Sequence, residues 1–129
     1  MARAVGEGLT AGGAVAKLFR LDGADRSDVA TELLDAGALL VGSPTLNNEI
    51  YPTLADTLTY LKGLRPKGLV GATFGSFGWG GQAAKILEGF LDEMGVERIS
   101  EPVRSKYVPD ADALKSCYEL GLKTARRIV

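Results

Sequence analysis

Apolar residues recur along this chain in two patterns, one with the period of a helix and one typical of strands. Helical spacing predicts five helices, whose apolar positions are Met1, Val5 and Leu9; Val29, Leu33 and Leu34; Leu54, Leu58 and Leu61; Ala83, Ile86, Leu87, Phe90, Leu91 and Met94; and Leu114, Cys117, Tyr118, Gly121, Ala125 and Ile128. Short apolar or alternating runs predict strands at residues 15–21, 38–41, 69–74 and 96–103. Strands that alternate with helices are typical of an α/β domain with a parallel sheet. We therefore expect residues 1–129 to form a single domain of this class.

Polar residues and glycines mark the ends of several of these helices. Asp25 or Ser27 can cap the second helix, and Asp110 or Asp112 can cap the last. Gly95 follows the most regular of the five periodic segments and predicts its end.

The balance of charge argues against a nucleic-acid partner. The chain has 15 basic and 16 acidic residues and a formal net charge of −1. A protein that binds nucleic acid through its phosphates needs a basic face, which this composition does not supply. With 46% hydrophobic residues the chain can instead bury an ordinary core.

The residue composition of the chain argues against several kinds of catalytic and metal site and against a membrane location. It has one cysteine, Cys117, and no histidine, so an intrachain disulfide, a histidine-dependent triad and a histidine-ligated zinc are excluded within these residues. We expect Cys117 to be an inert core thiol, and we expect a cytoplasmic location. No apolar run approaches the roughly 20 residues of a membrane span, so no membrane partner is expected. No acidic cluster has metal-ligand spacing, and no nucleophile has a neighbouring base, so neither metal nor catalytic residues are assigned.

The loop at residues 42–48, Gly-Ser-Pro-Thr-Leu-Asn-Asn, directly follows the apolar run Ala38–Val41. Its candidate site residues are Ser43, Pro44, Thr45, Leu46, Asn47 and Asn48. Their hydroxyl and amide groups match a neutral heteroaromatic ring whose edge alternates N–H and C=O groups. The other interpretation is a turn whose side chains bond to their own backbone.

A second loop, at residues 73–81, reads Thr-Phe-Gly-Ser-Phe-Gly-Trp-Gly-Gly and holds the only tryptophan. Its candidate site residues are Gly75, Ser76, Phe77, Gly78, Trp79 and Gly80. Glycines permit close approach of a ligand, and the aromatic side chains offer flat apolar surface. In parallel sheets, ligands bind beyond the carboxyl ends of the strands, where both loops are expected. A tight turn with buried aromatics is the alternative.

The sequence Gly78-Trp-Gly-Gly-Gln-Ala83 also fits the glycine pattern of dinucleotide-binding loops. That pattern belongs on the first strand-to-helix turn of a fold, whereas here it follows the third predicted strand. Glu101 could serve as the acidic residue of the motif. A dinucleotide-binding domain therefore remains a minor alternative.

Taken together, residues 42–48 and 75–81, with the helix at Gln82–Met94, resemble the flavodoxin-like domain of the A-type flavoproteins, also called flavodiiron proteins. The resemblance covers nearly the whole chain. It implies an FMN-binding domain, with a doubly wound parallel sheet of five strands in the order 2-1-3-4-5. It also implies that the flavin passes electrons to a redox partner, which in the family is a di-iron domain.

The resemblance implies which residues surround the flavin. Residues 43–48 would line one side of its ring, and residues 75–80 would line the other. Either Phe77 or Trp79 would cover a face of the ring. A homo-oligomer is compatible with this assignment.

Two departures from the family pattern change what we expect. The di-iron domain is not in these residues, so the chain alone is not a complete enzyme. The first strand of the family, central in the sheet, and its Ser/Thr-rich phosphate loop are also not present, because Met1 falls within the helix that follows them. We expect a fragment, a mis-started reading frame or a domain completed by another chain. Direct pairing of the strands at 15–21 and 38–42 is the least stable option, because it would give up two ladders of hydrogen bonds.

Two functions in different classes follow. The first is an FMN-dependent electron-transfer domain, which residues 42–48 and 75–81 favour. The second is a non-catalytic α/β assembly module without cofactor, which the missing phosphate loop favours.

Overall fold

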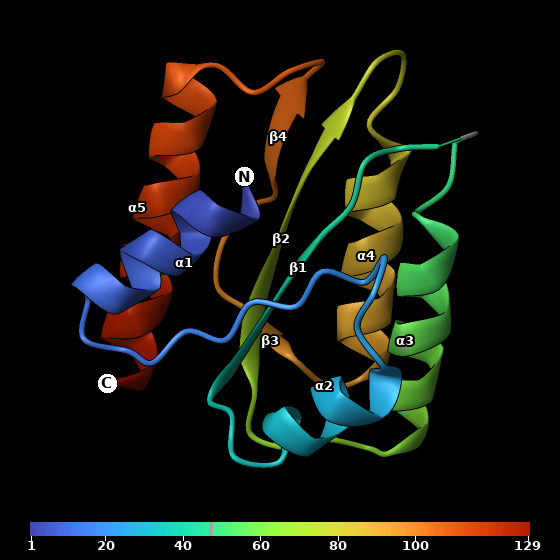
Figure 1. Cartoon of the computed structure of the whole chain (residues 1–129), viewed down its shortest axis with the longest axis vertical. Coiled ribbons are helices and arrows are strands. Elements are labelled where there is room, and N and C mark those ends of the chain that lie inside the picture. The colour runs from blue at the N-terminus through green and yellow to red at the C-terminus, as the bar shows by residue number, and fades with distance from the viewer. Residues whose placement is uncertain (47) are drawn as a thin grey trace.

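The computed structural model describes residues 1–46 and 48–129. It contains a parallel sheet with helices on both faces (Figure 1). The strands are β1 (Ala38–Gly42), β2 (Val70–Phe77), β3 (Glu97–Arg98) and β4 (Val103–Lys106). The helices are α1 (Ala2–Ala11), α2 (Arg26–Leu33), α3 (Pro52–Gly63), α4 (Gln82–Glu93) and α5 (Ala111–Ile128). All five predicted helices are confirmed, as is the predicted fold class.

The sheet has three strand positions, with β2 in the middle. β1 pairs in parallel with one side of β2, from Ala38 opposite Val70 to Gly42 opposite Phe74. β3 and β4 pair with the other side, at the beginning and at the end of β2. They therefore share one strand position, interrupted where residues 99–102 lie beside the shorter stretch Ala72–Thr73 of β2.

Two of the predicted strands differ from the structure at this side of β2. The strand expected at 96–103 is instead the pair β3 and β4, so residues 103–106 reach the carboxyl edge of the sheet. β2 runs to Phe77 instead of ending at Phe74, because Phe74–Phe77 pairs with Val103–Lys106. Gly75 and Ser76 are consequently strand residues and not loop residues.

The strand predicted at residues 15–21 does not form. Val15 is 88% exposed and Leu18 is 54% exposed, while Phe19 and Leu21 pack against the core without pairing. Alternating apolar residues make a strand only beside a partner strand. Within the described residues β1 pairs with β2 alone, so its other edge lies open, and the direct pairing judged least stable does not occur.

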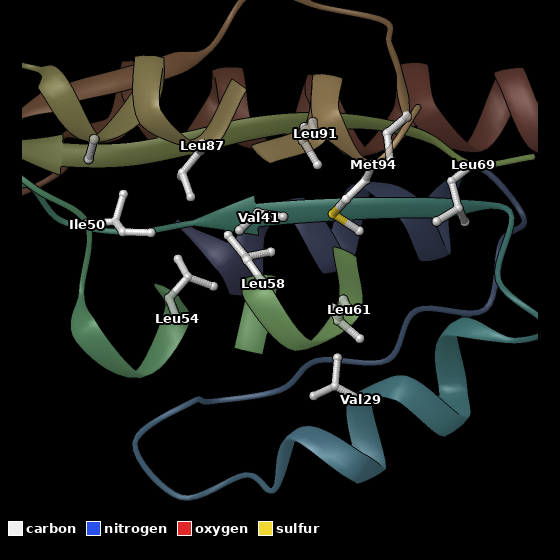
Figure 2. Close-up of a cluster of buried hydrophobic side chains, with 12 residues drawn as sticks. Val29, Val41, Ile50, Leu54, Leu58, Leu61, Leu69, Leu87, Leu91 and Met94 are labelled. Carbon is white, nitrogen blue, oxygen red and sulfur yellow. The ribbon is translucent and has the colours of Figure 1, made fainter. Parts of the chain in front are cut away.

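The larger core lies between the sheet and helices α2, α3 and α4. Figure 2 shows Leu54, Leu58 and Leu61 of α3 on one side of Val41, and Leu87 and Leu91 of α4 on the other. Leu87 and Leu91 are completely buried, as the helical spacing of α4 predicted. Leu34 is an exception to the predictions, because it follows the end of α2 and is 83% exposed.

The second core lies on the opposite face, under α1 and α5. Val5, Ala72, Phe74, Cys117 and Leu120 form it. Burial raises the pKa of the Cys117 thiol, as expected for an inert core cysteine. These two layers cover both faces of the sheet and leave its carboxyl edge free for a site.

The helix ends agree with the capping signals. The Asp25 carboxylate accepts a hydrogen bond of 2.7 Å from the Ser27 N–H, which lowers the pKa of Asp25. The Asp110 carboxylate accepts one of 2.8 Å from Ala113. Gly95 follows α4 with a φ of +75°, a conformation that glycine adopts without strain.

Candidate functional site

The two predicted site loops meet at the carboxyl edge of the sheet. The Ser43 N–H donates to the Phe74 carbonyl (3.2 Å), and the Thr45 N–H donates to the Ser76 carbonyl (3.0 Å). The first loop thus continues the pairing of β1 with β2 beyond Gly42. A Cβ added at Gly75 would come within 2.1 Å of the Ser43 carbonyl oxygen, so this contact requires glycine.

The hydroxyl groups of the first loop hold the loop in place. Ser43 is 5% exposed, and its Oγ donates to the Pro44 carbonyl (2.7 Å) and accepts from the Tyr51 N–H (2.9 Å). Thr45 Oγ1 accepts from the Ala83 N–H in the first turn of α4 (3.2 Å). Of these three bonds, the one from Ser43 Oγ to the Pro44 carbonyl is local, as in the turn interpretation of this loop, whereas the other two reach Tyr51 and Ala83.

Other residues of the first loop face solvent. Pro44 and Asn48 are exposed, and Leu46 is 42% exposed. Asn48 has a φ of +64°, in the left-handed region that asparagine tolerates better than most residues. Asn47, also predicted to line the site, lies outside the described residues.

The second loop presents a free backbone and a free aromatic side chain. In the described part of the chain, the N–H groups of residues 78–81 donate to no protein acceptor. Trp79 is 100% exposed, whereas Phe77 is half-buried. Gly78 and Gly80 lie on the same stretch, whereas Ser76 is part of β2. The second loop therefore offers backbone N–H donors without an acceptor among the described residues, beside the exposed ring of Trp79.

The structure adds residues to the site that the sequence did not single out. Arg104 of β4 lies opposite Gly75 and lines a small hollow together with Ser43, Thr45, Ser76 and other residues of both loops. The Tyr107 N–H donates to the Phe77 carbonyl (2.7 Å). Both were missed because Val103–Lys106 has no apolar run, so the strand was placed too early.

A larger open hollow lies away from these loops, lined by Asp92 and Arg98–Glu101. Asp92 and Glu88 bind the guanidinium of Arg98, and the hydrogen bond to Asp92 is the main cause that raises the pKa of Arg98. Since its one cation is already neutralised, the carboxyl-edge loops remain the better candidate site.

Within residues 1–46 and 48–129, no group of three or more acidic or cysteine side chains is arranged to hold a metal ion. In the same part of the chain, no helix is both long and apolar enough to cross a membrane.

Comparison with known proteins identifies the protein family to which a chain with this site belongs. The flavodoxin family model matches residues 1–121, so the chain belongs to the flavodoxin family. It is 53% identical over 129 residues to the nitric oxide reductase of Moorella thermoacetica, covering 99% of this chain and 32% of that protein.

Two solved structures agree with this assignment. The rubredoxin oxygen:oxidoreductase of Desulfovibrio gigas superposes with a TM-score of 0.95 at 39% identity, over 98% of this chain and 32% of that one. The flavodiiron protein of Giardia intestinalis gives a TM-score of 0.93 at 30% identity, with the same coverage. The chain therefore spans about a third of the length of these relatives.

The particular resemblance to the flavodoxin-like domain of flavodiiron proteins is thus confirmed. The predicted cofactor, FMN, and the predicted electron-transfer role are confirmed with it. The dinucleotide and assembly-module alternatives gain no support from these matches.

Proposed function

We propose that the two carboxyl-edge loops hold the isoalloxazine ring of FMN between them and relay electrons to a di-iron centre on a partner domain. The observation that carries this proposal is the convergence of residues 43–46 and 48 with residues 75–80 at one edge of the sheet. Backbone hydrogen bonds from Ser43 to Phe74 and from Thr45 to Ser76 join the two loops there. When bound, FMN supplies the electron-carrying chemistry, for which this chain has no side chain of its own.

The free groups of the second loop fit the polar edge of a flavin. Besides one ring N–H, that edge presents carbonyl oxygens and unprotonated ring nitrogens, which accept hydrogen bonds and need donors. The N–H groups of residues 78–81 donate to no acceptor in the described chain and are available as such donors. This supports binding through backbone groups at the second loop.

The aromatic residues divide into two roles. Trp79 is completely exposed, so it can cover a ring face and lose contact with water on doing so. Phe77 is half-buried beside Arg104 and supports the loop from beneath. We assign the ring-covering role to Trp79.

The first loop contributes its outer residues. Ser43 and Thr45 hold it against the backbone, while Pro44, Leu46 and Asn48 remain open to a ligand. Asn47 is included from its place in the sequence alone. Together these residues would form the second wall for the ring.

The partner and the location are part of the proposal. The flavodiiron relatives are about three times as long as this chain, which leaves room in those proteins for a di-iron domain that can receive the electrons. We also infer a cytoplasmic location, supported by the single, buried cysteine. Self-association is compatible with the fold.

The test is a titration with ligands that share the ring but differ in the phosphate. Riboflavin and FMN are added separately to the protein, and the fluorescence of Trp79, the only tryptophan, reports binding. Both flavins are expected to saturate the quenching, while NADH is not. The ratio of the two affinities measures what this chain contributes toward the phosphate. Failure of both flavins to bind contradicts the proposal.

A further inference from the structure

Arg104 lies at the base of the second loop and contacts residues of that loop. It pairs with Gly75 across β2 and β4, so its side chain starts at the base of that loop. Its guanidinium carbon lies 5.9 Å from the centre of the Phe77 ring. A Cβ added at Gly81 would come within 2.6 Å of Nη1, so the guanidinium lies directly against the Gly81 backbone. One side chain thus contacts both ends of residues 77–81.

The charge of Arg104 is not neutralised by a neighbouring acid. In the described part of the chain, the arginines that form ion pairs are Arg20, Arg26, Arg98 and Arg127. Among the described residues no carboxylate forms an ion pair with Arg104, and the other cation of its strand, Lys106, lies over the Tyr107 ring. A guanidinium without a counter-ion at the edge of the hollow gives the site a local positive charge.

We propose that Arg104 is a positioning residue for residues 77–81 and that its charge favours the reduced form of FMN. This inference rests on the proposed function. Adding two electrons and one proton to the neutral isoalloxazine leaves it with one negative charge. A fixed cation stabilises that charge and has little effect on the neutral, oxidised ring. The site would therefore hold reduced FMN more tightly than the same loops without Arg104.

The two roles can be separated by substitution. Arg104→Gln removes the charge and the contact with the Phe77 ring. Arg104→Lys keeps the charge but loses the planar group that contacts Phe77 and Gly81 together. Lys67→Gln is the matched control, because it removes one positive charge just before β2, at the opposite end of that strand.

The experiment measures Kd for oxidised FMN and for FMN reduced anaerobically with dithionite. In Arg104→Gln we expect the affinity for the reduced form to fall about tenfold more than that for the oxidised form. In Arg104→Lys both affinities should fall by the same factor, and in Lys67→Gln neither should change. An equal loss for both forms in Arg104→Gln would overturn the role of the charge.

A second measurement tests the positioning role without any flavin. The backbone order of residues 78–81, measured by NMR relaxation, should be lower in both Arg104 variants than in the wild-type protein, and unchanged in Lys67→Gln. Unchanged order in the Arg104 variants would overturn this role. If the wild-type protein binds neither form of FMN, the proposed function fails together with the charge effect, whereas the relaxation result still decides on positioning.

Discussion

The Thr45 hydroxyl accepts a hydrogen bond of 3.2 Å from the Ala83 N–H and so ties the first site loop to the start of α4. The N–H groups of a first helical turn have no partner within the helix. The N-cap residue of α4 is Gly81, which has no side chain with which to cap the helix. Thr45 therefore acts as a cap from a distant part of the sequence and couples the two loops.

Thr45→Val is expected to lower the free energy of unfolding by about 1 kcal/mol, because the valine keeps the shape but leaves the Ala83 N–H without its acceptor. Chemical denaturation measures this loss. Flavin affinity should fall as well, since the loops are no longer tied together.

Thr59→Val is the matched control for this substitution. Its hydroxyl donates to the Ala55 carbonyl within α3, on an exposed helix surface. The change should alter stability by less than about 0.5 kcal/mol. If Thr45→Val is equally mild, the bond to Ala83 does not stabilise the fold.

Trp79→Ala should separate binding from stability. The side chain is 100% exposed, so its removal should change the free energy of unfolding by less than about 0.5 kcal/mol. Flavin binding should weaken by about 1–3 kcal/mol, the usual loss for a stacked aromatic side chain. Titration followed by the flavin absorbance bands measures the affinity, because this variant has no tryptophan.

Two further variants make the Trp79 prediction specific. Trp79→Phe should keep most of the affinity, since it retains a flat ring. Tyr118→Ala removes an aromatic residue of α5, 36% exposed, and should leave the affinity unchanged. Equal flavin affinity in wild type and Trp79→Ala would show that Trp79 does not contact the ring.

The sequence predicted an element correctly where the residues that determine it lie within the element itself. α4 could be predicted almost to its last residue, because six apolar positions at helical spacing record a buried face within one short segment. The strand at 15–21 could not be predicted correctly, because its alternation of apolar residues gives a strand only beside a partner, and no strand of the described chain pairs with it.

The site was predictable as two loops but not as individual contacts. The positions of both loops follow from where β1 and β2 end. That the Ser43 and Thr45 hydroxyls bind backbone groups depends on residues up to 38 positions away, which the loop sequence does not reveal. Arg104 was missed for the same reason, since only strand pairing brings it beneath Gly75.

The crossing of α1 and α5 predicts a severe effect for a small substitution. An added Cβ at Gly121 would lie 2.1 Å from the Val5 carbonyl oxygen, so Gly121→Ala must force the two helices apart. We expect it to lower stability by about 1–3 kcal/mol, the usual cost of overpacking. Denaturant unfolding followed by circular dichroism measures the change.

Gly89→Ala is the control for this prediction. Gly89 lies within α4 with nothing within 4 Å of an added Cβ, so alanine there should stabilise the protein by about 0.5–1 kcal/mol. The two substitutions are chemically identical, and both lie inside helices. A similar gain in stability from both would show that the contact at Gly121 is not close.

The open edge of β1 predicts alternating hydrogen exchange along the strand. The Val70 N–H donates to the Gly37 carbonyl, and the Ser43 N–H donates to the Phe74 carbonyl. Since backbone groups of a strand alternate in direction, Leu39 and Val41 also face β2, whereas Leu40 and Gly42 face the open edge.

Exchange measured by NMR should therefore be slow at the Leu39 and Val41 amides and fast at those of Leu40 and Gly42. All four residues lie in one short strand between the same layers of helices, so local unfolding alone would protect them equally. Dilution supplies the control, because an edge covered by a second copy would lose its protection as the concentration falls. Equal, slow exchange at all four amides in dilute protein would mean that the edge is covered by the chain itself, contrary to the pairing seen here.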